Sequence, residues 1–346
     1  MPPLVAGTWK RITPASLDTN AFPCSDIQFA PSNPSTLIAV HGAGGGLWKS
    51  TDAGVNWVQI GDLPMPNSLG RVLIDPKNEK HLYYVGSVGN ASMGFWISQD
   101  GGNTWKIPKA FSDGAGKIWS SDVYGIVADP TDFNHIVMTF HYPWPNIEPA
   151  AGILESLDGG VSFIPHNPPP GMDHAQGVAF LYNPALGIGN KNTWLVGAGY
   201  GGGLFRTTDA GATWKSVSTL QQNHGGFDAH YSSSGNIYIG STSGLHRSRD
   251  NGATWTQITQ GLGSNYIYGA IGDGNYLYTS YDFVSLPMNQ PFFVSPEGGS
   301  DEGTVWTPYS KQTLVEGAFK MTFEPASRTI YSANWSQGAW ALKVTP

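Results

Sequence analysis

The sequence has very little cysteine, few charged residues and no long apolar run. The single cysteine, Cys24, excludes a disulfide within the chain of 346 residues. Charged residues make up 12% of the chain and the net charge is −7, so the basic stripe expected of a nucleic-acid-binding protein is missing. No apolar run approaches the length of a membrane span, and no segment is typical of a signal peptide. We therefore expect neither nucleic acid nor a membrane as a partner.

A short box, Ser/Thr-x-Asp-x-Gly-x-Thr-Trp, dominates what the sequence does contain. With small variations it occupies residues 50–57, 98–105, 156–163, 207–214 and 248–255. Each copy lies between two short apolar segments. An Asp side chain can accept hydrogen bonds from turn amides, and Gly adopts positive φ without a Cβ penalty. Each box is therefore predicted to be a hairpin turn whose Asp is structural.

A second repeat extends the unit beyond the boxes. A strand with a corner, often at Pro, followed by another apolar strand recurs seven times, the first time at 27–40 and the last at 319–332. Evenly spaced short strands with a period of roughly 45 to 50 residues are typical of four-stranded propeller blades. The last unit lacks a fourth strand, which residues 7–12 can supply. We predict an all-β fold, a single seven-bladed β-propeller domain over 1–346 whose ring is closed by the N-terminal strand.

These boxes resemble those of the Asp-box (BNR-repeat) propellers, which include sialidases, xyloglucan-active glycosidases, sorting receptors and lectins. The resemblance implies that function lies on the face opposite the box turns, in the loops that do not repeat. Those loops bring four histidines and two tyrosines together as candidate acid/base groups: His41, His141, His174, His224, Tyr200 and Tyr281. Histidine suits proton transfer because its ordinary pKa lies near neutrality.

Candidate substrate-binding residues lie on the same face. Arg71 and Lys320 could clamp a substrate carboxylate, or they could form a salt bridge with Asp26. Exposed tryptophans could stack on sugar rings, and the candidates are Trp119, Trp144 and Trp335. Carboxylates could provide an acid/base pair for glycoside hydrolysis, and these are Asp122, Asp173, Asp228 and Asp282. No metal-ligand spacing is present, so no cofactor is expected, although Ca²⁺ could help to bind a uronate.

Three functions remain open at this point. A single propeller with a His-rich mouth resembles the secreted fungal L-rhamnose-α-1,4-D-glucuronate lyases, which implies β-elimination at the rhamnosyl-glucuronate ends of arabinogalactan. The alternatives are a single-propeller glycoside hydrolase with an Asp/Glu pair and a sugar-binding lectin. Because the loops diverge while the scaffold repeats, one central site is favoured, and so is an enzyme. The sequons at Asn90 and Asn334 are compatible with secretion. We expect an extracellular monomer that binds a plant-type acidic polysaccharide.

Overall fold

The computed structural model describes almost the whole chain. The described residues are 4–43, 45–61, 63, 69–87, 94–112, 117–120, 122–141, 144, 152–172, 174–199, 202–223, 226–263, 266–281 and 290–345. Within these ranges the regular structure is strand, apart from one short 3₁₀ helix, η1 (Pro184–Leu186). No helix in the described part of the chain is long and apolar enough to cross a membrane.

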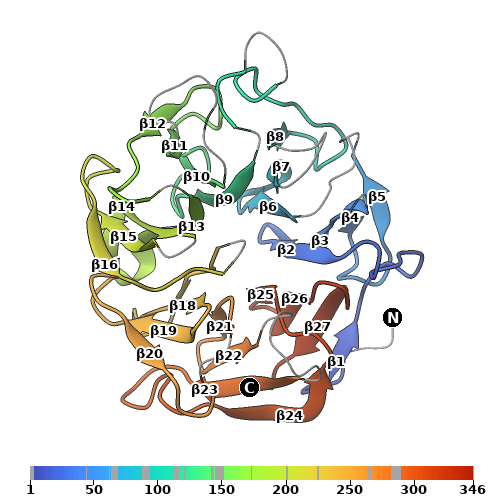
Figure 1. Cartoon of the computed structure of the whole chain (residues 1–346). Coiled ribbons are helices and arrows are strands. Elements are labelled where there is room, and N and C mark those ends of the chain that lie inside the picture. The colour runs from blue at the N-terminus through green and yellow to red at the C-terminus, as the bar shows by residue number, and fades with distance from the viewer. Residues whose placement is uncertain are drawn as a thin grey trace. The chain divides into compact units, whose positions relative to one another are not determined.

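The chain forms two compact units. Unit 1 comprises residues 1–106 and 270–346, and unit 2 comprises residues 107–269. Figure 1 shows the strands of both units in sequence colours. The expectation of one domain over 1–346 stays a prediction.

Unit 1 holds four antiparallel sheets. The first contains β2 (Cys24–Ala30), β3 (Asn33–His41), β4 (Gly46–Ser50) and β5 (Val58–Ile60). The second contains β6 (Leu69–Asp75), β7 (Asn78–Ser87) and β8 (Gly94–Ser98). The third contains β21 (Ala270–Gly272), β22 (Tyr276–Ser280), β23 (Gln290–Pro296) and β24 (Thr307–Leu314). The fourth contains β25 (Lys320–Glu324), β26 (Thr329–Ala333), β27 (Ala339–Lys343) and β1 (Trp9–Arg11).

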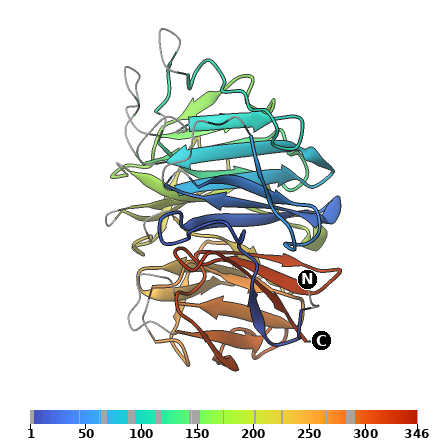
Figure 2. The ribbon, with the colours of Figure 1, turned by 90° about the vertical axis from the view of Figure 1, so that its right-hand side faces the viewer.

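The N-terminal strand completes the last sheet, as the sequence predicts. β1 pairs antiparallel with β27, with Trp9 opposite Leu342 and Arg11 opposite Trp340. Figure 2 shows the blue N-terminal strand beside the red C-terminal strands. The two ends of the chain are therefore tied together by a ladder of backbone hydrogen bonds.

Unit 2 holds three antiparallel sheets of four strands. The first contains β9 (Val123–Ala128), β10 (Ile136–Phe140), β11 (Ile153–Ser156) and β12 (Ile164–His166). The second contains β13 (Ala175–Asn183), β14 (Ile188–Ala198), β15 (Gly203–Thr207) and β16 (Lys215–Ser218). The third contains β17 (His230–Tyr231), β18 (Ile237–Ser241), β19 (Gly244–Ser248) and β20 (Thr256–Ile258).

The seven sheets confirm the predicted class, an all-β seven-bladed β-propeller, with one local difference. The sheet of β6 to β8 has three full strands, and a single bridge between Ile97 and Lys106 stands where the fourth would be. Continuing the antiparallel register would place Pro108 opposite Phe95. Because proline has no N–H to donate, the ladder stops after one pair.

The box turns are built as the sequence predicts. In the first box the Ser50 hydroxyl donates to Asp52 Oδ1 at 2.8 Å and accepts from the Gly54 N–H at 2.8 Å. Asp52 Oδ1 also accepts from the Asn56 N–H at 2.8 Å, and Gly54 has a φ of +86°. These hydrogen bonds lower the pKa of Asp52 to about 2. The box aspartate is thus a structural residue of the turn.

The core lies between neighbouring sheets within each unit. In unit 2, Val137 of β10 packs in one cluster with Val178 of β13 and with Trp194 of β14, which is fully buried. In unit 1, Ile27 of β2 clusters with Tyr331 of β26. Alternate residues of each strand therefore face the adjacent sheet, as the two-residue period of a strand requires.

Candidate functional site

A histidine–aspartate pair lies where β9 begins and β10 ends. These strands are antiparallel, with Val123 opposite Phe140, so the residues just outside them, Asp122 and His141, are neighbours. The Asp122 carbonyl accepts from the His141 N–H at 3.1 Å. His141 Nδ1 lies 3.0 Å from Asp122 Oδ2. Because the carboxylate accepts this bond, Nδ1 carries the proton.

Two further rings surround His141. Tyr124 of β9 stacks on it, with ring centroids 4.4 Å apart and planes at 6°. The His174 ring lies 5.6 Å away. His174 immediately precedes β13, and its carbonyl accepts from the Gly199 N–H at 3.0 Å. Unit 2 thus brings the predicted residues Asp122, His141 and His174 together.

Trp119 and Trp144 lie beside this pair, but they are not the exposed platforms expected from the sequence. They are 4% and 3% exposed, respectively. Their rings meet edge to face with centroids 4.8 Å apart, and Trp144 also packs on Phe140 at 5.3 Å. The two rings are covered by each other and by their surroundings, so the expectation of exposed rings is wrong for Trp119 and Trp144. Neither indole N–H has a hydrogen-bond partner among the described residues.

The predicted basic cluster of unit 1 surrounds a buried carboxylate. Asp26 is 2% exposed and accepts from the Val72 N–H at 3.0 Å and from Gln28 Nε2 at 2.9 Å. Burial raises the pKa of Asp26, while the Val72 N–H and the charges of Lys320 and Arg71 act to lower it. Lys320 is itself buried. The structural alternative, a charge cluster of Asp26, Arg71 and Lys320, fits these surroundings, and the carboxylate clamp stays a prediction.

His41 is buried completely. Its Nδ1–H donates to the Phe22 carbonyl at 3.0 Å, and its Nε2 has no hydrogen-bond partner in the described part of the chain. Burial lowers the pKa of His41 to about 4. Burial therefore favours the neutral ring, and an acid/base role for His41 stays a prediction.

The remaining candidates are dispersed or lie outside the described residues. Tyr281 is half-buried, 5.1 Å from the Phe293 ring. Trp335 is half-buried, 5.7 Å from the Phe319 ring. His224 and Tyr200, with Asp173, Asp282 and the sequon at Asn90, lie outside the described part of the chain. The other sequon residue, Asn334, is fully buried and donates to the Glu316 carbonyl, so it offers no accessible glycosylation site in the folded chain.

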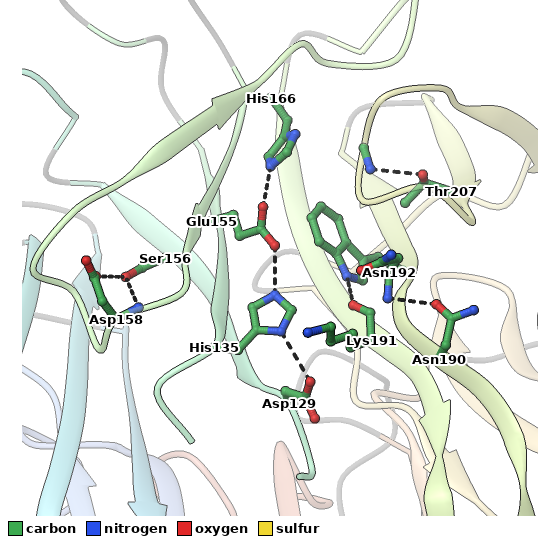
Figure 3. A network of polar contacts seen from close by, with 12 residues as sticks. Asp129, His135, Glu155, Ser156, Asp158, His166, Asn190, Lys191, Asn192 and Thr207 are labelled. Atoms are coloured by element: carbon green, nitrogen blue, oxygen red, sulfur yellow. Dashed lines mark hydrogen bonds and ion pairs between the residues drawn. The ribbon is translucent and has the colours of Figure 1, made fainter. Parts of the chain in front are cut away.

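A second histidine cluster, shown in Figure 3, was not predicted. His135 Nδ1 lies 3.2 Å from Asp129 Oδ2 and its Nε2 lies 2.8 Å from Glu155 Oε1, while His166 Nε2 lies 2.8 Å from Glu155 Oε2. One signal could have found it, because Glu155 is an acidic residue at a strand position where other copies carry Lys49, Arg206 or Arg247. Both nitrogens of His135 bind carboxylates of the protein, so this network is structural.

Two other findings limit the kind of site. Among the residues that the structure describes, no group of three or more His, Cys, Asp or Glu side chains is placed to hold a metal ion. An open hollow of about 480 Å³ beside the third box is lined by Lys109, Lys117 and Phe163, among others. None of the candidate residues lines it.

The chain is similar to several known proteins, but these similarities do not assign it to a family. No family model matches the chain. The xyloglucanase Xgh74A of Acetivibrio thermocellus is 27% identical over 222 residues, which is 54% of this chain and 24% of the relative. An ancestral GH74 enzyme superposes with a TM-score of 0.66 at 17% identity, covering 96% of this chain and 46% of that one. YCF48 from Cyanidioschyzon merolae superposes with a TM-score of 0.63 at 13% identity, covering 98% and 99%.

These relatives correct the expected reaction. The chain spans about a quarter of the length of the curated xyloglucanase that it matches, and that relative is a hydrolase by name. The expectation of a polysaccharide lyase is therefore wrong, and the rhamnosyl-glucuronate ends of arabinogalactan have no support. The solved structures, at 17% and 13% identity, show the propeller fold alone.

Proposed function

We propose that the chain is an extracellular, carbohydrate-active propeller of the glycoside hydrolase type, acting on a plant polysaccharide. The observation that carries the proposal is the similarity to a xyloglucanase over 54% of the chain. The Asp122–His141 pair supports it, because a histidine held by a buried carboxylate is suited to proton transfer. This is the glycoside hydrolase alternative raised by the sequence, with a histidine in place of one member of the Asp/Glu pair expected there.

The chemistry requires an acid and a base. Hydrolysis breaks the bond between the anomeric carbon and the glycosidic oxygen while water adds to that carbon, so one group protonates the leaving oxygen and another takes a proton from water. We assign one of these transfers to His141 Nε2, with Asp122 fixing the ring through Nδ1. Asp228, a half-buried carboxylate in the loop before β17, is our candidate for the second group.

The test is hydrolysis of xyloglucan, followed by the appearance of reducing ends. The Asp122→Asn variant should lose about 100-fold or more in kcat, because the histidine would lose its carboxylate partner. Asp301→Asn, which changes an exposed carboxylate of unit 1, is the matched control and should leave the rate unchanged. Equal rates for wild type and Asp122→Asn would refute the assignment.

A sugar-binding role without catalysis is the second candidate. The match to the xyloglucanase covers only 24% of that enzyme, which is compatible with a propeller that binds the polysaccharide without cleaving it. Binding of xyloglucan oligosaccharides by calorimetry, with no new reducing ends after long incubation, would select this role. Neither binding nor cleavage across a panel of plant polysaccharides would overturn both candidates.

A further inference from the structure

The side chain of Gln222 is buried without satisfying its amide. Gln222 is 3% exposed, and among the residues that the structure describes neither its Oε1 nor its Nε2 has a hydrogen-bond partner. The next residue, Asn223, donates to the Ile267 carbonyl at 2.7 Å, but its Oδ1 is also unpartnered. A buried polar group without a partner costs about 1–3 kcal/mol. Two consecutive residues thus carry three unsatisfied polar atoms, a cost that the folded chain alone does not explain.

Gln222 packs against the sheet of β13 to β16, at the end of that sheet where His174 precedes β13. A Cβ placed on Gly197, near the end of β14, would come within 2.5 Å of Gln222 Cγ. Two residues further on, the Gly199 N–H donates to the His174 carbonyl at 3.0 Å. The His174 ring in turn lies 5.6 Å from the His141 ring. A continuous series of contacts within unit 2 therefore leads from the Asp122–His141 pair to Gln222.

Gly197 and Gly199 leave room for the side-chain amides of Gln222 and Gln176. Any side chain at Gly197 would collide with Gln222, and a Cβ on Gly199 would lie 2.3 Å from Gln176 Nε2. Neither glycine has a positive φ, so close approach is the feature that requires glycine here. The segment is thus built around side-chain amides that an alanine would displace.

We infer that the Gln222 carboxamide is a ligand-binding group that hydrogen-bonds hydroxyls of a neutral sugar unit bound beside His174. The inference rests on the proposed function and names a further residue of that site. A carboxamide offers two donors and an acceptor, and adjacent sugar hydroxyls offer the same mixture in return. The unsatisfied amide is then a cost in the ligand-free state that is recovered when the sugar binds.

The inference makes stability and binding change in opposite directions. Gln222→Met keeps the length of the side chain and removes its polar atoms. The ligand-free variant should melt at the same temperature as wild type or higher, because removing an unsatisfied buried amide is neutral or stabilising. Its affinity for xyloglucan oligosaccharides should fall about 10-fold, as expected when about 1.4 kcal/mol is lost. Gln222→Leu provides a second apolar replacement if the first does not fold.

A matched control separates this effect from amide loss in general. Gln257 of β20 donates to the Ser243 carbonyl at 2.6 Å, so Gln257→Met removes a satisfied amide from the same unit. It should lower the melting temperature slightly and leave affinity unchanged. A Gln222→Met protein that melts lower than wild type and binds equally well would show a structural amide and overturn the inference.

The outcome is distinguishable from failure of the proposed function. Wild-type protein that binds xyloglucan oligosaccharides without cleaving them would refute the hydrolase assignment, while weaker binding by Gln222→Met would still support the role of Gln222. Wild-type protein that cleaves xyloglucan with a KM unchanged by Gln222→Met would refute the role of Gln222 alone. A wild-type protein that binds no sugar of the panel would overturn both.

Discussion

The two ends of β10 carry histidines in opposite situations. His135, just before the strand, has one ring nitrogen at Asp129 and the other at Glu155, and Glu155 also binds His166. His141, just after the strand, has Nδ1 at Asp122 and aromatic rings around it. Among the described residues of unit 2, the polar atoms of Gln222 and the indoles of Trp119 and Trp144 are buried without hydrogen-bond partners.

The surroundings of His135 and His141 show how structural and functional histidines can be distinguished in a repeat fold. His135 has both ring nitrogens at carboxylates of the protein and so has none left for a ligand, whereas a cluster beside unsatisfied buried donors and acceptors has polar groups to offer one. Both ends contain a histidine bonded to a buried aspartate, so that pair alone does not discriminate. The state of the surrounding polar groups does.

The largest expected effect on stability comes from removing Glu155, which binds both His135 and His166. Glu155→Ala leaves His135 and His166 each without the carboxylate that they bind at 2.8 Å. Removing one partner of a buried ion pair costs about 3–5 kcal/mol. Urea unfolding should show a loss of this size in the free energy of unfolding.

The control for that variant is a carboxylate nearer the solvent. Glu79 is only partly buried and accepts from Asn33 Nδ2 at 3.1 Å, so Glu79→Ala should cost less than about 1 kcal/mol. Equal stability of the two variants would mean that the network of Figure 3 does not hold unit 2 together.

The scaffold could be predicted from the sequence more completely than the site. The boxes and the strand from Trp9 to Arg11 are local or repeated patterns, so each copy supports the others. The burial of His41 and of Trp119 depends on packing between segments distant in sequence, which one sequence does not reveal. Gln222 carried no signal at all, because an unsatisfied amide becomes visible only when its neighbours are placed.

A smaller effect should appear in the free energy of unfolding at low pH. Burial alone would raise the pKa of Glu155, but the hydrogen bonds and charges of His135 and His166 lower it to about 2, from the ordinary 4.5. The unfolded chain therefore binds the proton first as the pH falls. The stabilisation is fully present above about pH 4.5 and is lost toward pH 2.

Comparison of wild type with Glu155→Gln tests that assignment. Urea unfolding at a series of pH values should give a steeper fall for wild type between pH 4.5 and 2, because the glutamine cannot titrate. The box aspartates, whose pKa values are also lowered, contribute equally to both proteins. Parallel curves would show that Glu155 is not the group responsible.

The smallest expected effect is in the titration of His41. It would show that this histidine does not contribute to any change in activity near neutral pH. With a folded pKa of about 4 against 6.5 for an ordinary histidine, His41 stays neutral, and its contribution to stability is lost only as the pH falls from about 6.5 to 4. Its NMR ring signals should not titrate between pH 8 and 5, and a midpoint near 6.5 would contradict the burial of the ring. If the signals stay constant, any change in hydrolysis rate over that pH range must arise from groups other than His41, and His141 becomes the first residue to substitute.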